Sequence, residues 1–292
     1  ISGAFLMGWL GTYLLVMIQA TLADEHHENS AIALTESNIV ASIFAACVPL
    51  MVGLGATSGF TWRLAPMLGI GMWLLIAISS RGVRIPVAHM DTSTDGSLKH
   101  LPRLFWLYLP VIFLSVAMEW CVIFWSADFL DKVIQMPTEQ AATVTSVFLV
   151  AMIIGRIVAS RLTQHYKPQQ LLWIAIVLIA VGFPMFWLGQ TEMVNVVGLF
   201  ITGLGIANLF PLGLSIASQV GRHASDLASS RVSLAAGSAI LIMPQVLGSA
   251  ADVIGIANAF AIVPIFLLSL TIMLTIANRQ YNQSQKASNI LT

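Results

Sequence analysis

Long runs of apolar residues, separated by short polar segments, recur from one end of the chain to the other. Each run holds about 20 residues, the length that an α-helix needs to cross a hydrocarbon layer of about 30 Å. A membrane β-strand needs only about 10 residues of alternating polarity, so these uniform runs favour helices. The pattern predicts nine membrane-spanning helices, at residues 3–22, 38–58, 64–80, 104–126, 140–160, 169–188, 194–216, 232–250 and 256–277.

Composition supports the membrane interpretation. Hydrophobic residues make up 58% of the 292 residues and charged residues only 9%, whereas an average soluble domain carries about 25% charge. So few charges cannot cover a water-facing surface, which excludes a soluble enzyme and a disordered chain. Lys and Arg together number 13, as do Asp and Glu, so there is no basic surface for a nucleic acid. The sequence predicts an all-α integral membrane protein.

Positive charges gather on one side of the predicted membrane. If alternate loops face the same side, 11 of the 13 Lys and Arg residues lie on the side of the first loop, at or near the span ends. The positive-inside rule makes that side cytoplasmic. It predicts a protein of the cell membrane whose C-terminus lies in the cytoplasm and whose Ile1 lies on the outer side. The cations on that side are Arg81, Arg84, Lys99, Arg103, Arg156, Arg161, Lys167, Arg222, Arg231, Arg279 and Lys286, whereas Arg63 and Lys132 lie on the other side.

The polar segment 81–103 is the only stretch that resembles a linker. It divides a partial N-terminal bundle of three helices (1–80) from a C-terminal bundle of six helices (104–278). The final segment, 279–292, is rich in Asn, Gln and Ser, which predicts a disordered cytoplasmic tail.

An internal repeat relates the two parts. A shift of 195 residues places Gly8 on Gly203, Pro49 on Pro244 and Gly53 on Gly248. Repeats of this kind are frequent in transporters. The repeat predicts a six-plus-six arrangement whose first three helices precede this sequence. Because Ile1 opens directly inside an apolar run, without a basic region or a cleavage site, we expect residues 1–22 to form a span rather than a signal peptide.

Three segments resemble those of the major facilitator superfamily. Gly155-Arg156-Ile-Val-Ala-Ser-Arg161-Leu162 resembles the second-half copy of the family's loop motif, although the usual Asp is absent. Gly203-Leu-Gly205-Ile-Ala-Asn208-Leu-Phe-Pro211 resembles its tenth helix, and Gln19 to Asp24, with Ala33-Leu34 and Pro49, resembles the junction of its fourth and fifth. The resemblance implies helices 4–12 of a transporter that works by alternating access, with a substrate bound near the midplane between the halves.

Glu119 is the one carboxylate deep in a predicted span. An ionised group there costs about 2.5–3.5 kcal/mol on insertion scales, so its presence favours a role in proton coupling or substrate binding. Ser115 and Ser126 share its helical face, and Tyr108 lies close to that face, which suits the lining of a cavity. Trp120, its neighbour, could stack on a substrate, although Trp is commoner in interfacial belts. The alternative for Glu119 is a neutral carboxyl that hydrogen-bonds to a neighbouring helix.

Asn208 and Gln245 lie beside helix-breaking prolines, Pro211 and Pro244. A proline leaves the carbonyl four residues earlier without a donor and softens the helix. An amide beside such a break is a candidate substrate contact, and it is equally a candidate bridge between helices.

Arg156 lies near the cytoplasmic end of its span. Two roles are open for it: pairing with an acid of a neighbouring helix to lock the outward-facing state, or snorkelling to the membrane surface as an anchor. Gly155 and Arg161 belong to the same candidate gating motif.

No cofactor or metal is expected. The acidic and histidine-rich segment Asp24–Glu28 lacks an i, i+4 His pair, no strand precedes the glycines at 203 and 205, and there is no P-loop. Small residues such as Gly203, Gly205, Ala236 and Gly237 predict close helix packing. Cys47 and Cys121 lie in apolar runs and predict no disulfide framework.

The leading hypothesis is therefore a secondary transporter in a lipid bilayer that moves a small-molecule metabolite together with protons. A multidrug exporter working by proton antiport is the first alternative. An integral-membrane enzyme or a channel is the second, but the spans hold neither clustered catalytic groups nor repeated pore charges.

Overall fold

The computed structural model describes residues 64–82 and 100–291, together with parts of 10–44. All regular structure in these residues is helical. The elements are α3 (Leu64–Ser79), α4 (Arg103–Lys132), α5 (Thr138–Leu162), α6 (Pro168–Leu188), α7 (Glu192–Val220), the short 3-10 turn η2 (Arg222–Ala224), α8 (Ser225–Ile254), α9 (Ile256–Ala259) and α10 (Ile262–Leu291). The predicted all-α membrane fold is confirmed.

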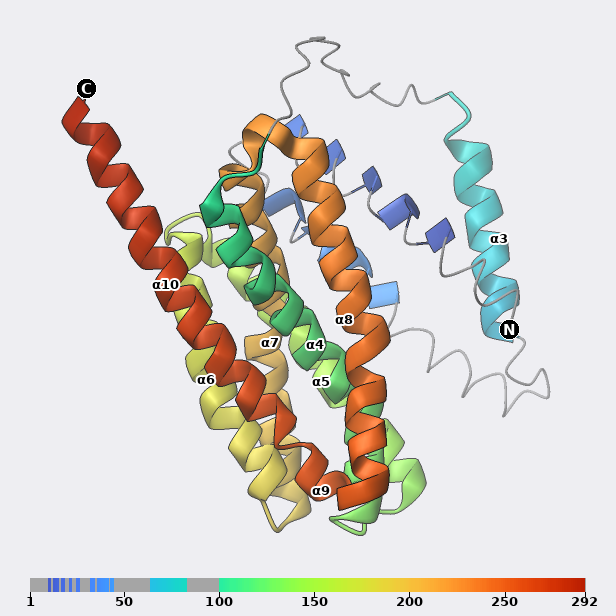
Figure 1. Cartoon of the computed structure of the whole chain (residues 1–292). Coiled ribbons are helices and arrows are strands. Elements are labelled where there is room, and N and C mark those ends of the chain that lie inside the picture. The colour runs from blue at the N-terminus through green and yellow to red at the C-terminus, as the bar shows by residue number, and fades with distance from the viewer. Residues whose placement is uncertain are drawn as a thin grey trace.

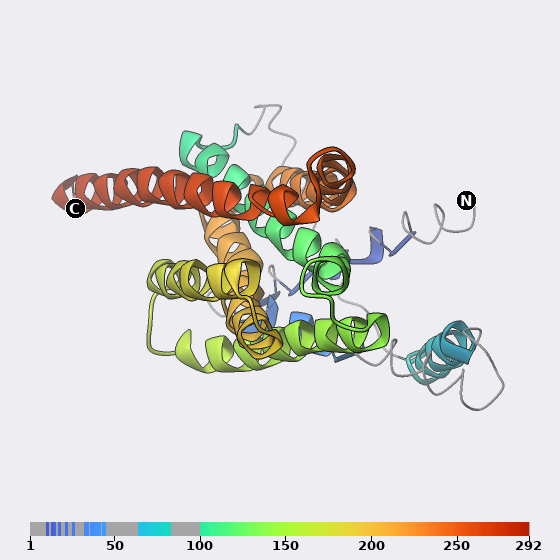
Figure 2. The same cartoon turned by 90° about the horizontal axis from the view of Figure 1, so that it is seen from below.

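Six helical segments of the described chain are long and apolar enough to cross a membrane. They form one bundle, in which α4 contacts α5, α7, α8 and α10, and α7 packs against both α5 and α6 (Figure 1). Seen from below, α4 runs through the middle of this group, while α3 stands apart from it (Figure 2). The bundle therefore brings the central parts of α4, α5 and α7 together.

Glycines set the close approach of α7 to its neighbours. A Cβ on Gly203 would lie 2.8 Å from the Phe148 carbonyl oxygen of α5, and one on Gly205 would lie 2.8 Å from the Ala175 carbonyl oxygen of α6. Helices in lipid associate through such backbone contacts, so the predicted packing role of these two glycines is confirmed. Gly237 of α8 differs, because no described atom lies within 4 Å of its Cβ position.

The helices extend beyond the predicted spans. The α4 helix continues to Lys132 and α8 begins at Ser225, because a helix can project from the hydrocarbon into the polar boundary, where charged side chains are hydrated. The span predicted at 256–277 is interrupted at 260–261, between α9 and α10. The prediction of a disordered tail is wrong for the described residues, since α10 runs to Leu291.

Several sequence predictions fall outside the described residues. The spans 3–22 and 38–58 and the linker 81–103 are described only in part. Gly8, Pro49 and Gly53, the first members of the repeat, lie outside them, as do Cys47 and most of Asp24–Glu28. The domain boundaries and the six-plus-six arrangement therefore stay predictions.

Candidate functional site

A buried ion pair joins α4 to α5. The Nη2 atom of Arg156 lies 3.3 Å from Oε1 of Glu119, and the two side chains are 8% and 14% exposed. Glu119 comes from the middle of α4 and Arg156 from the last third of α5. The burial of Arg156 disagrees with a surface anchor and agrees with pairing to an acid of a neighbouring helix. A gating role remains a prediction.

Arg156 also donates to two backbone carbonyls. Its Nε atom donates to the Ala207 oxygen of α7, and its Nη1 atom donates to the Asn38 oxygen, both at 3.3 Å. Asn38 belongs to the helical residues 36–41, which precede α3 in the chain. One guanidinium therefore links three helices of the bundle to the N-terminal part of the protein. Such an arrangement satisfies a charge that would be costly if left unpaired.

Asn208 lies next to this cluster. Its Nδ2 atom donates to the Gly155 carbonyl oxygen at 3.1 Å and to the Leu204 oxygen at 3.3 Å. A Cβ on Gly155 would lie 2.8 Å from the Leu204 oxygen, so this position must be glycine for the backbones to meet. The amide thus bridges helices, while its Oδ1 atom is buried without a hydrogen-bond partner among the described residues.

The two serines of the predicted polar face are buried and bonded within the protein. Ser115 donates to the Val111 oxygen of its own helix at 2.6 Å. Ser126 lies 3.2 Å from the Thr145 hydroxyl of α5. Tyr108 donates to Oδ1 of Asn278 in α10 at 2.8 Å. The hydroxyl groups of Ser126 and Tyr108 join helices in the observed conformation and that of Ser115 bonds within α4, so a role in lining a cavity requires a rearrangement.

The remaining candidates are Trp120, Gln245 and Arg161. Trp120 packs in a small apolar cluster with Val116 and Ala239, and its ring lies 5.7 Å from that of Phe124. Gln245 and Arg161 are exposed, so the structure does not bring them to Glu119. No group of three or more His, Cys, Asp or Glu side chains in the described residues could hold a metal ion.

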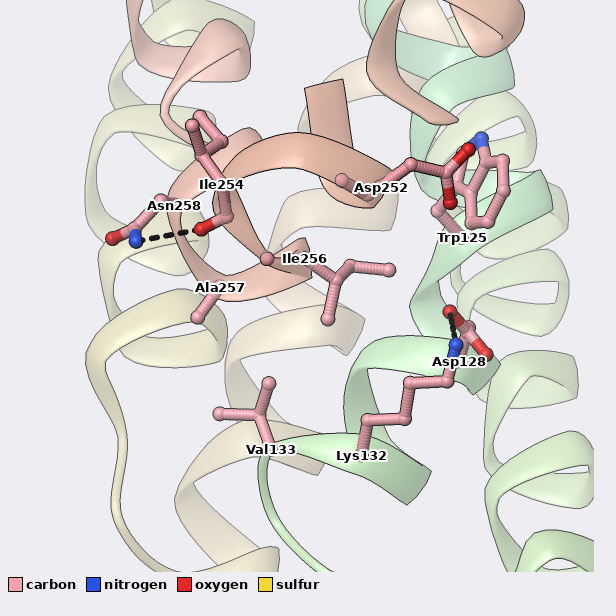
Figure 3. A pocket seen from close by; sticks show the side chains of 11 residues that line it. Trp125, Asp128, Lys132, Val133, Asp252, Ile254, Ile256, Ala257 and Asn258 are labelled. Atoms are coloured by element: carbon pink, nitrogen blue, oxygen red, sulfur yellow. Dashed lines mark hydrogen bonds and ion pairs between the residues drawn. The ribbon is translucent and has the colours of Figure 1, made fainter. Parts of the chain in front are cut away.

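A second polar region lies at the Lys132 end of α4 (Figure 3). Trp125, Asp128, Lys132 and Asp252 line a cavity of about 390 Å³ between α4, α8 and α9. Asp128 and Lys132 form an ion pair of 3.0 Å. The Trp125 Nε1 atom donates to the Pro244 carbonyl oxygen at 2.9 Å. The sequence did not point to this group, because the predicted spans end before Asp128 and Asp252, although the i, i+4 spacing of Asp128 and Lys132 was a usable signal.

The chain matches the sequence profile of the Major Facilitator Superfamily over residues 1–225 and again over residues 108–289. Among curated proteins, it is 24% identical to an uncharacterized MFS-type transporter of Yersinia pestis, over 75% of this chain and 58% of that protein. It is also 24% identical to the membrane protein MosC of Rhizobium meliloti, over 57% of this chain and 40% of that protein. The chain thus spans about half the length of these relatives.

Two solved structures have a similar fold. The MFS transporter FucP in the outward conformation superposes with a TM-score of 0.68 at 17% identity, over 85% of this chain and 68% of that chain. A structure of the E. coli fucose:proton symporter FucP gives 0.67 at 18% identity, over 85% and 69%. At this identity the likeness establishes the fold.

Proposed function

Because this chain belongs to the Major Facilitator Superfamily, we propose that it acts in a secondary active transporter that moves a small solute across the membrane by alternating access. We propose further that transport is coupled to protons and that the solute is a metabolite. The observation that carries the proposal is the buried pair of Glu119 and Arg156. A carboxylate retained at this depth is a functional candidate by default.

The family consists of transporters, so the protein is a multi-pass membrane protein and not an enzyme. Its helices cross a lipid bilayer. We place it in the cell membrane with the C-terminus in the cytoplasm. Arg103, Arg161, Lys167 and Arg222 support this orientation, because all four lie at helix ends or turns on one side of the bundle.

The pair offers a way to couple proton uptake to movement of the two parts of the protein. Ionised Glu119 attracts Arg156, which also binds the Asn38 carbonyl of the N-terminal part. A proton on Glu119 removes that attraction, so the Arg156 guanidinium is held by its other contacts, among them those to the Ala207 and Asn38 carbonyl oxygens. Protonation therefore weakens the link between α4 and Arg156, the residue that also bonds to the N-terminal part, and shifts the balance between two conformations. The fold likeness to a fucose:proton symporter is consistent with this direction of coupling.

Transport by the full-length protein in liposomes tests the proposal. A panel of labelled sugars, amino acids, carboxylates and amines is offered with and without an inward proton gradient. We expect the gradient to drive accumulation of one class of solute, and Glu119→Gln to abolish that accumulation while expression stays normal. Glu192→Gln, which changes an exposed carboxylate at the start of α7, is the matched control and should transport normally.

The outcomes separate the alternatives. Expulsion of the solute against an inward proton gradient would indicate antiport instead of symport. Transport that ignores the gradient and survives Glu119→Gln would remove protons and Glu119 from the mechanism. Movement of none of the solutes, with the protein folded, would contradict transport of these classes.

A further inference from the structure

Pro211 lies inside α7. Proline has no backbone N–H, so the carbonyl oxygen of Ala207, four residues earlier, lacks the donor that an uninterrupted helix would supply. At membrane depth water does not fill such a gap, and an unbonded carbonyl is costly. The Ala207 oxygen therefore needs a donor from outside its own helix.

Arg156 supplies a donor. Its Nε atom donates to the Ala207 oxygen at 3.3 Å. The guanidinium is a rigid plane, so fixing Nε fixes the directions of the other two nitrogens. In the structure one of them faces Glu119 and the other faces Asn38.

The neighbouring residues hold the same two helices in register. While Arg156 of α5 donates to Ala207 of α7, Asn208 of α7 donates back to Gly155 of α5. These consecutive residues form a reciprocal pair of contacts between the helices. This register places the Ala207 oxygen, which has no donor from its own helix, where Arg156 can reach it.

We propose that Pro211 is a positioning residue for the ion pair: by leaving the Ala207 carbonyl without a helical donor, it provides the anchor that holds the Arg156 guanidinium against Glu119. This rests on the proposed function only for the importance of the ion pair in transport. The competing explanation is that Pro211 bends α7 and has no particular relation to Arg156. The two explanations differ in whether the effect of changing Pro211 depends on Arg156.

Thermal unfolding of the full chain in detergent measures that dependence without any substrate. Pro211→Ala introduces an N–H that competes for the Ala207 oxygen. Arg156→Lys keeps the positive charge but lacks the Nε donor. We expect Pro211→Ala to be less favourable in the Arg156 background than in the Arg156→Lys background, by about 2–4 °C in the unfolding midpoint, the size expected for one hydrogen bond in a chain of this length.

Pro184→Ala in α6 is the matched control. Pro184 is also inside a helix, and the residue four positions earlier, Ala180, is exposed. Its substitution should shift the midpoint equally in both backgrounds. If Pro211→Ala also shifts the midpoint equally in both, the proposal is wrong and Pro211 only shapes the helix.

A backbone ester gives a second test that needs no change at Arg156. Lactic acid at position 211 has the side chain of alanine but no N–H. We expect the ester variant to unfold no earlier than Pro211→Ala, because the ester preserves the Arg156 anchor. An Ala variant more stable than the ester by about 2–4 °C, the value of one more helical hydrogen bond, would overturn the proposal. Neither test depends on transport, so a failure of proton coupling would leave these results unchanged, and the reverse also holds.

Discussion

Arg156 and Glu119 pair at 3.3 Å between two helices, with less than a sixth of either side chain exposed. A pair of this kind is more costly to break than it is favourable to form, because both charges lose hydration on burial and each then depends on the other. We therefore predict that a change of one proton at the cluster around Arg156 alters the packing of several helices.

Removing one member of the pair should cost more than removing both. Arg156→Met leaves Glu119 without its partner, and we expect a loss of about 3–5 kcal/mol in the free energy of unfolding at neutral pH. The double variant with Glu119→Gln should lose less, because no unpaired charge remains. Unfolding in mixed detergent micelles of increasing denaturing strength measures the loss in the single and in the double variant.

The pH dependence of these variants provides the control. A proton on Glu119 removes the unpaired charge in Arg156→Met, so its deficit should shrink as the pH falls. In Glu119→Gln no carboxylate remains to be neutralised, and Arg156 stays protonated at all accessible pH values, so no such recovery is expected. Equal and additive losses at every pH would show that the two residues do not depend on each other.

The sequence predicted the spans of the bundle well because lipid imposes one requirement, a long apolar helix, on every crossing segment. It singled out Glu119 for the same reason, since a carboxylate inside a span is costly and conspicuous. The partner of Glu119 was not predictable, because it lies 37 positions away in the chain. Which residues at such a separation come into contact depends on how the helices pack. Two roles for Arg156 and for Asn208 fitted the sequence equally well until burial and hydrogen bonds were seen.

Gln245 and Asn208 were both candidates because each lies near a proline, but the structure places their side chains differently. Gln245 follows Pro244 as Asn208 precedes Pro211 by three residues, yet Gln245 is exposed and Asn208 is buried. A proline marks where a helix carbonyl is free, but the direction in which a nearby side chain points depends on how the whole helix is rotated.

Gly248 is where Trp125 of α4 crosses α8. A Cβ at Gly248 would overlap the indole ring, whose Nε1 atom donates to the Pro244 oxygen. Gly248→Ala should therefore destabilise the bundle by about 1–3 kcal/mol, the range for overpacking. Gly237→Ala, in the same helix with no described atom near its Cβ position, should be neutral or stabilising by up to about 1 kcal/mol. Comparing their unfolding midpoints checks this, and equal effects would contradict it.

Asn195, near the start of α7, hydrogen-bonds to the C-terminal end of α6. Its Nδ2 atom donates to the carbonyl oxygens of Phe186 and Gly189 at 2.6 and 3.1 Å, and the residue is fully buried. Asn195→Asp replaces the donor by oxygens that face two carbonyls, so we expect a loss of about 2–4 kcal/mol. Asn258→Asp changes a similar amide-to-carbonyl bond at an exposed site and should cost under about 1 kcal/mol. A similar loss at both sites would show that burial does not set the cost at Asn195.

We predict the orientation of the bundle in the membrane from the end that carries most of its cations. Gln135 lies in the turn between α4 and α5, at the Lys132 end, and His165 lies in the turn between α5 and α6, at the end that carries Arg161 and Lys167. Both side chains are exposed. If the more cationic end faces the cytoplasm, a membrane-impermeant thiol reagent added to intact cells should label Gln135→Cys and leave His165→Cys unlabelled.

Permeabilised cells provide the control for that experiment, since both cysteines should then react to a similar extent. The two native cysteines are first replaced by alanine, so that labelling reports only the introduced position. The reverse pattern in intact cells would place the C-terminus outside.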